Sequence, residues 1–141
     1  MAVFNKFNSF VQELGKGTHN FSAHVLKAAL TNTLPVNTNT VLANITQIAT
    51  GGGYTTGAGG GLLLDGVTWT NAAGTSKLVI TDEVFTASAS VGPFRYVVIY
   101  NDTATNDELI GWYDYGSSIT LATSESLTID FDATNGVLTL V

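Results

Sequence analysis

Residues 94–116, FRYVVIYNDTATNDELIGWYDYG, carry the strongest fold signal in this chain because they predict a β-hairpin. Both arms are rich in Tyr, Val, Ile and Trp, which favour strands. The segment between the arms contains Asn101, Asp102, Asn106 and Asp107, residue types that favour turns and loops. We therefore predict two strands built for burial, joined by a polar loop that is displayed at the surface.

Short strand-like segments recur through the C-terminal half of the chain. We expect strands in seven of them: 62–70, 77–87, 94–101, 108–115, 118–123, 126–131 and 136–141. Residues 131–140, FDATNGVLTL, should close the fold as a hairpin, because Asn135-Gly136 supplies the positive φ angles of a tight turn. Many short strands without long helices between them predict a mainly β chain, folded as an antiparallel β-sandwich or a jelly-roll-like barrel.

Residues 4–14, FNKFNSFVQEL, predict a short amphipathic helix that ends at Gly15. Its large apolar residues recur at or beside helical spacing: Phe4, Phe7, Phe10, Val11 and Leu14. The helix can pack on the sheet of its own chain, or it can dock as an arm on a neighbouring subunit. We expect residues 1–20 to form this N-terminal helix or arm and residues 21–141 to form a single β domain.

The middle of the chain is less regular. Residues 24–32, HVLKAALTN, predict a strand, residues 33–40 predict a loop, and residues 41–48, VLANITQI, fit either a strand or a short helix. Residues 51–61, GGGYTTGAGGG, contain seven of the fifteen glycines. Because glycine loses the most entropy on ordering, this segment is either a flexible loop or is held in place by a neighbour.

Composition limits the classes of function. Charged residues make up 11% of the 141 residues, and the net charge is −6. That charged fraction is less than half of the roughly 25% that is typical of soluble domains, and a surface poor in Lys and Glu resembles an interface. We therefore expect an assembled protein. The five basic residues are scattered, which argues against nucleic acid as a partner.

The sequence predicts a soluble chain without a membrane partner, since no apolar run approaches the roughly 20 residues of a spanning helix and no signal peptide is recognisable. The absence of cysteine excludes disulfides and thiolate metal sites. His19 and His24 are the only histidines, and a spacing of five places them on neither one helical face nor one strand face. We predict no catalytic residues, no cofactor and no metal.

Two weaker hypotheses concern ligands. Asp102, Asn106 and Asp107 can supply oxygen ligands to Ca²⁺ from one loop, although their spacing does not match an EF-hand and turn formation explains them more simply. A sugar-binding platform would use four aromatic residues: Trp69, Trp112, Tyr113 and Tyr115. Packing in the core is the alternative explanation for these rings, and we favour it.

Four stretches of the chain resemble small virion structural proteins of tailed bacteriophages. They are MAVFNKFNSFVQEL (1–14), LKAALTNTLPVNTNTVLANITQI (26–48), VGPFRYVVIYNDTATNDELIGWYDYGSSITL (91–121) and FDATNGVLTL (131–140). The resemblance implies a non-enzymatic head decoration, or cement, protein that is made in the bacterial cytoplasm and joins the capsid surface. Its partner would be the major capsid protein, and the preferred assembly would be a homotrimer.

In such a trimer, contacts between subunits would order the glycine-rich segment and the N-terminus. The candidate interface residues are Phe4, Phe7, Phe10, Val11, Leu14, Tyr54 and Trp112. Two alternatives stay open: a tail or fibre-associated virion protein that contacts the host, and a carbohydrate-binding β-sandwich module.

Overall fold

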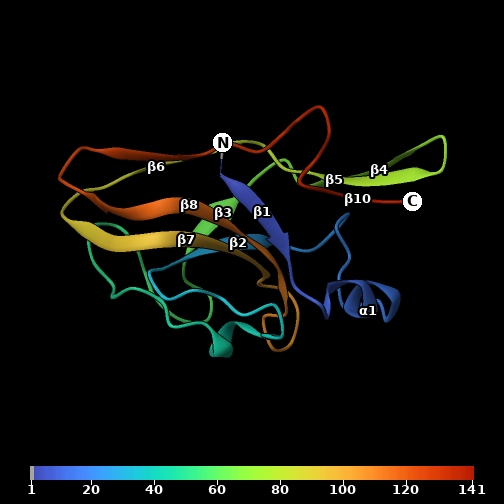
Figure 1. Cartoon of the computed structure of the whole chain (residues 1–141), viewed down its shortest axis with the longest axis horizontal. Coiled ribbons are helices and arrows are strands. Elements are labelled where there is room, and N and C mark those ends of the chain that lie inside the picture. Colours follow the sequence, from blue (N-terminus) through green and yellow to red (C-terminus); the bar gives the residue numbers. More distant parts are fainter. Residues whose placement is uncertain (1) are drawn as a thin grey trace.

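The computed structural model describes residues 2–141 of the chain. Its largest element is an antiparallel sheet of five strands in the order β1-β8-β7-β2-β3. Figure 1 shows this central sheet crossing the middle of the molecule. Its strands are β1 (Val3–Lys6), β2 (Leu26–Thr31), β3 (Leu62–Leu64), β7 (Val91–Asn101) and β8 (Leu109–Leu121).

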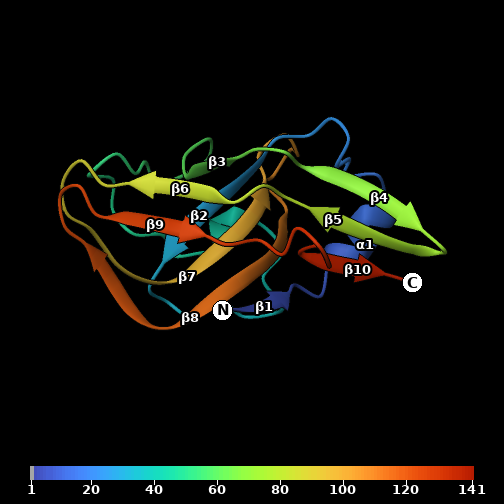
Figure 2. The same cartoon turned by 90° about the horizontal axis from the view of Figure 1, so that it is seen from above.

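Two smaller antiparallel sheets lie on one side of the central sheet (Figure 1, Figure 2). One pairs β6 (Glu83–Thr86) with β9 (Ser126–Ile129) and lies over the central sheet. The other joins β4 (Thr68–Ala72), β5 (Thr75–Val79) and β10 (Leu138–Leu140) and extends beyond the edge of the central sheet. Leu78 of β5 and Ile129 of β9 belong to the same buried cluster as Val97 of the central sheet. The predicted mainly β fold with antiparallel sheets is confirmed, and the layers are consistent with a β-sandwich.

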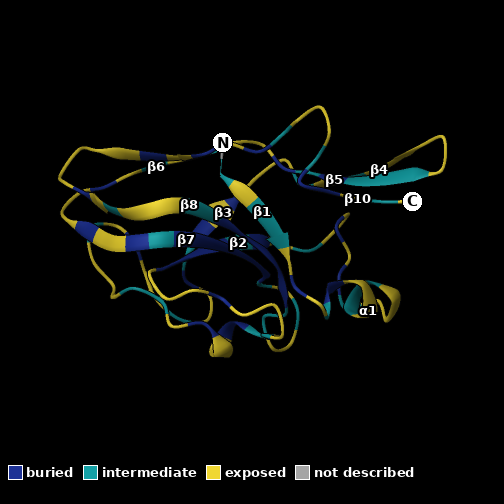
Figure 3. Ribbon diagram, in the orientation of Figure 1, coloured by how far each residue is buried: buried dark blue, intermediate teal, exposed yellow. Residues whose placement is uncertain are grey.

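The predicted hairpin of residues 94–116 is confirmed as β7 and β8, and it is buried on both faces. Successive side chains of a strand point to opposite faces of its sheet. In β7, Val97 and Ile99 face the smaller sheets, whereas Val98 and Tyr100 lie in a second buried cluster on the other face. Figure 3 shows the inner parts of β2 and β7 in the colour of buried residues.

The second cluster is covered by the long connection between β2 and β3. The ambiguous residues 41–48 form a single 3₁₀ turn, η1 (Leu42–Asn44), which buries Leu42 and Ile45 against the sheet. The full cluster consists of Phe7, Ala29, Leu42, Ile45, Tyr96, Val98, Tyr100, Leu109 and Trp112. The connection covers the sheet without forming a strand of its own, as the loop prediction for residues 33–40 anticipated.

The predicted N-terminal helix is wrong in its first half. Residues 3–6 form β1, which pairs with β8, and the helix α1 spans only Phe10–Gly15. Phe7 contacts the ring of Trp112, with ring centroids 4.6 Å apart, while Phe10 is buried in the cluster of the smaller sheets. Pairing with β8 overrides the helical periodicity, so this segment is built into the sheet and is not a separate arm.

The predicted C-terminal hairpin is also wrong. β9 pairs with β6 and β10 pairs with β5, so residues 130–137 link two different sheets. The turn itself forms: the Asp132 carboxylate accepts the backbone N–H groups of Thr134 and Asn135, and Gly136 has φ of +83°. Asx chemistry and glycine therefore make a turn here without pairing the strands on either side of it.

Two segments that were predicted as separate strands form one continuous strand. The strands that were predicted separately at 108–115 and 118–123 form the single strand β8, which continues through Gly116 at φ of +83°. Glycine tolerates this left-handed conformation, so the strand bends without ending.

Phe7→Ala tests whether the N-terminal segment belongs to the fold. We expect it to lower the free energy of unfolding by about 3–5 kcal/mol, because Phe7 is fully buried and its loss leaves a cavity beside Trp112. Urea unfolding followed by tryptophan fluorescence measures this change. Val11→Ala in α1 is the control: Val11 is 44% exposed, so its cost should stay within about 0.5 kcal/mol. Equal, small effects of both substitutions would show that the segment is a detachable arm.

Candidate functional site

The glycine-rich segment, residues 51–61, is held by side chains of the adjacent central sheet. The Tyr100 hydroxyl donates to the carbonyl oxygen of Gly60 at 2.6 Å, and Lys27 Nζ donates to the carbonyl oxygen of Gly59, also at 2.6 Å. Of the two possibilities that the sequence left open, the second is correct: neighbours hold the segment, and those neighbours belong to the same chain.

Tyr54, inside this segment, is a second anchor. Its buried hydroxyl accepts the backbone N–H of Leu30 at 3.0 Å and donates to Gln47 Oε1 at 2.8 Å. Burial raises the pKa of Tyr54 to about 12, so the phenol keeps its proton and can donate at neutral pH. Gln47 Oε1 also accepts the backbone N–H of Gly57 at 3.3 Å. These bonds fix the shape of the surface beside the segment.

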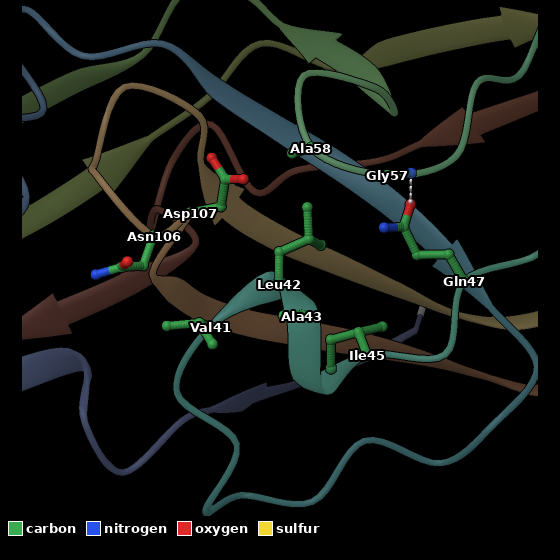
Figure 4. Close-up of a pocket in the computed structure, with 9 residues that line it drawn as sticks. All are labelled: Val41, Leu42, Ala43, Ile45, Gln47, Gly57, Ala58, Asn106 and Asp107. Atoms are coloured by element: carbon green, nitrogen blue, oxygen red, sulfur yellow. Dashed lines mark hydrogen bonds between the residues drawn. The ribbon is translucent and has the colours of Figure 1, made fainter.

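A cavity of about 390 Å³ opens between the glycine-rich segment, η1 and the β7–β8 loop (Figure 4). It is lined by Val41, Leu42, Ala43, Ile45, Gln47, Gly57, Ala58, Asn106 and Asp107. Figure 4 shows Gln47 and Asp107 on opposite sides of Leu42. Burial, followed by the charges of Asp102 and Glu108, raises the pKa of Asp107. An amide and a carboxyl group across an apolar floor can hydrogen-bond a small polar molecule, and no nucleophilic side chain lines the cavity beside them.

The β7–β8 loop is less displayed than predicted. Asp102 lies 3.1 Å from Lys27 Nζ in an ion pair, and the Asn106 side chain donates to Glu108 Oε1 at 3.1 Å. Asn101 is fully buried. Among residues 2–141, no three His, Cys, Asp or Glu side chains gather in a group that could hold a metal ion. Two residues of the calcium hypothesis, Asp102 and Asn106, therefore bond to other side chains of the protein.

The two histidines, which the sequence placed on no common face, meet at Asn101. Asn101 Nδ2 lies 3.1 Å from His19 Nδ1 and 3.0 Å from His24 Nδ1. His19 is almost fully buried, and its ring stacks on Phe10 and Phe21. Nothing in the sequence signals this cluster, because a loop brings the histidines to a strand end that lies about eighty positions further along the chain.

The four aromatic residues of the sugar-binding hypothesis do not form one platform. Trp112 and Tyr113 are buried on opposite faces of the central sheet. Trp69 lies on β4, where it contacts Phe21 at a centroid distance of 5.4 Å. Core packing, the favoured explanation, accounts for Trp112 and Tyr113, so the platform hypothesis is wrong as stated.

The predicted interface residues are distributed between core and surface. Phe7, Phe10, Tyr54 and Trp112 are buried, Phe4 and Leu14 are half-buried, and Val11 is exposed. The buried four contact the core of their own chain. Phe7, Phe10 and Tyr54 are therefore not available to a partner in this conformation, whereas Trp112 keeps a small exposed area.

Phe4 and Trp112 do meet at one surface feature, a groove of about 560 Å³ beside β1. The groove, which we call the β1 groove, is lined by Phe4, Asn5, Lys6, Leu34, Pro35, Val36, Asn37 and Trp112. Leu34 is 61% exposed and Val36 is 54% exposed. Residues 33–40 were predicted only as a loop, and these two side chains were not among the predicted interface residues. The sequence feature that could have indicated them is one aliphatic residue on each side of Pro35 in an otherwise polar segment.

Comparison of the chain with protein-family models, with curated proteins and with solved structures finds no match. Within the described part of the chain, no helix has the length and apolar character needed to span a bilayer.

Gly60→Ala tests how closely the glycine-rich segment is packed. A Cβ at Gly60 would lie 2.3 Å from the backbone carbonyl oxygen of Thr55, so we expect a loss of about 1–3 kcal/mol in the free energy of unfolding. Gly51→Ala is the matched control, since a Cβ there meets no atom within 4 Å and neither glycine has a positive φ. Thermal unfolding of both variants measures the difference. If Gly60→Ala is as stable as Gly51→Ala, the segment does not pack as described.

Proposed function

We propose that this chain is a non-enzymatic structural protein of a tailed-bacteriophage particle. The specific role is that of a head decoration protein that stabilises contacts between subunits of the major capsid protein. Support comes from the resemblance of residues 1–14, 26–48, 91–121 and 131–140 to small virion proteins. On this proposal the chain is made in the bacterial cytoplasm, joins the capsid surface and needs no cofactor.

The observation that carries the proposal is the β1 groove. β1 is an outer strand of the central sheet, so one side of its backbone has no neighbouring strand among residues 2–141. Leu34 and Val36 add exposed aliphatic surface beside this edge, and Lys6 is the single charged residue that lines the groove. An open strand edge beside apolar pockets is the arrangement that accepts an extended segment of another protein. We infer that the occupant is an extended segment of a capsid subunit.

The distribution of charge supports a contact surface of this kind. Four of the five basic side chains are engaged within the chain, and they contact Glu13, Asp102, Thr134 and Asp114. The fifth, Lys6, lies in the β1 groove. Most basic groups are thus engaged within the chain, which is compatible with a surface that binds through apolar contact and backbone pairing.

The preferred assembly is a homotrimer, with one refinement. The glycine-rich segment and the N-terminal phenylalanines are already ordered by contacts inside one chain. Contacts between the subunits of a trimer would therefore use exposed side chains. Light scattering coupled to size-exclusion chromatography measures whether three copies associate.

Quantitative mass spectrometry of purified particles tests the proposed location. We expect a copy number comparable to that of the major capsid protein, because decoration follows the symmetry of the capsid lattice. A copy number that is a small fraction of this value would favour the tail or fibre alternative over decoration. Absence of the chain from intact particles would refute a virion role.

Leu34→Asp tests the β1 groove as the capsid contact. A charge placed in a buried apolar contact without a partner is costly, so binding to particles that lack this chain should weaken by at least about tenfold. Val84→Asp on β6 is the matched control, because Val84 is 58% exposed and lies outside the β1 groove. Co-sedimentation of each purified variant with such particles gives the affinities. Equal binding by both variants would exclude the groove as the contact surface.

A further inference from the structure

The side chain of Asn101 joins two segments that are distant in the sequence. Asn101 is the last residue of β7 and is fully buried. Its Nδ2 group lies 3.2 Å from the Thr18 carbonyl oxygen, in addition to its contacts with Nδ1 of His19 and of His24. Asn101 therefore fastens residues 16–25, which follow α1, to the end of the central hairpin.

The orientation of the Asn101 amide is fixed by its other partners. Oδ1 accepts the backbone N–H groups of Thr103 at 3.1 Å and Ala104 at 3.2 Å, and an N–H group can only donate. The amide nitrogen must therefore face Thr18 and the two histidines. Nδ2 carries two hydrogens and faces three acceptors, so these contacts share two donated bonds. Both rings turn Nδ1 toward this donor, which favours the neutral tautomer with its proton on Nε2.

His24 Nδ1 is approached by two donors. Besides Asn101 Nδ2, the backbone N–H of Asn20 points at the same atom from 3.3 Å. Two donors thus converge on His24 Nδ1, which acts as an acceptor in the closed cluster.

His19 repeats this constraint in a more buried setting. Its ring packs against both Phe10 and Phe21, with centroids 5.5 Å and 5.7 Å away, and its buried Nε2 has no hydrogen-bond partner in the described residues. Desolvation by burial lowers the pKa of His19, and the charge of His24 acts in the same direction. The positive form of His19 is therefore disfavoured while the cluster is closed.

Acidic groups surround the cluster and partly oppose the lowering of the His19 pKa. Glu13 on α1 and Glu108 beside β8 raise the pKa of His19. Glu13 is itself hydrogen-bonded to Lys16 and Thr18, and Glu108 is hydrogen-bonded to Asn106. Further along the same loop, Asp102 pairs with Lys27, and burial raises the pKa of Asp107. Desolvation is the largest contribution for His19, so the net direction favours the neutral ring.

We propose that the His19–Asn101–His24 cluster is a proton-operated latch that holds residues 16–25 against the β7–β8 turn and releases them on acidification. Solvent reaches the latch through His24, which lines an open cavity of about 500 Å³ together with Thr103 and Glu108. Release would uncover the apolar faces of Phe10 and Phe21, which stack on His19 and on each other.

The direction and size of the effect follow from linkage. A histidine whose pKa is lower in the closed state than in the open state stabilises closure fully above the open-state value of about 6.5, and this stabilisation is lost as the pH falls below it. At pH 5.5, one unit below that value, opening through His19 increases by up to roughly tenfold. Histidine is the side chain whose unperturbed charge change falls between pH 5 and 8, which places the response in this window.

Hydrogen exchange of the full chain at pH 7.5 and pH 5.5 tests the latch. After correction for the intrinsic chemical rates, we expect protection of amides in residues 18–25 and 102–104 to fall by up to roughly tenfold at the lower pH. Amides in the centres of β7 and β8 should keep their protection. Unchanged protection of residues 18–25, or equal loss in the central strands, would overturn the proposal.

His24→Asn is the matched variant, because an Asn side chain can place an oxygen acceptor where Nδ1 lies but cannot be protonated. It should leave the pH-dependent loss of protection in place, because His19 is unchanged. Disappearance of the pH dependence in this variant would contradict the role of His19. Independently of any variant, ¹⁵N spectra of the imidazole rings at pH 7.5 should show both as Nε2–H tautomers. An Nδ1–H tautomer in either ring would overturn the proposal.

Discussion

Burial of both faces of the β7–β8 hairpin is the constraint on which the rest of the structure depends. A strand with apolar residues on one face needs one covering layer, but Tyr96–Tyr100 presents large apolar side chains on both. The chain meets this requirement in two ways. Small antiparallel sheets cover one face, and the long connection between β2 and β3 covers the other (Figure 1).

The connection between β2 and β3 has few strand or helix hydrogen bonds of its own. Polar side chains therefore supply hydrogen bonds to its backbone. Buried backbone groups need hydrogen-bond partners, and a covering loop cannot obtain them from a sheet ladder. Tyr54 and Tyr100 supply hydroxyl groups to Leu30 and Gly60, and Thr31 Oγ1 donates to the carbonyl oxygen of Thr46. The glycines allow this loop to approach the sheet closely, as at Gly61, where a Cβ would lie 2.5 Å from the Ala28 carbonyl oxygen. A low charge content and a high glycine content thus serve the same packing requirement.

The limits of sequence-based prediction follow from the same distinction between local and distant contacts. The central hairpin was predictable because both arms and the turn lie within residues 94–116 and carry strong strand propensity. The C-terminal hairpin failed because the Asn135-Gly136 turn is local, whereas the partners of β9 and β10 lie about forty to sixty positions away. Phe7 was assigned to a helix because its spacing from Phe4 and Val11 is helical, and only the presence of β8 makes a strand the better choice. In the candidate site, the glycine-rich segment could be recognised, but the β1 groove and the Asn101 cluster depend on tertiary contacts that periodicity does not encode.

Anchors within this chain differ in their response to acid. Tyrosine hydroxyl bonds, such as those of Tyr54 and Tyr100, are insensitive to pH near neutrality, because burial raises the pKa of both phenols. The Arg95–Asp114 ion pair is similarly insensitive, since Arg95 lowers the pKa of Asp114 and keeps it ionised. The Asn101 cluster is different: it includes the buried His19 Nδ1, and protonation of a histidine converts an acceptor nitrogen into a donor. The segment after α1 is therefore held under different conditions from the central sheet, which allows it to open while the hairpin stays closed.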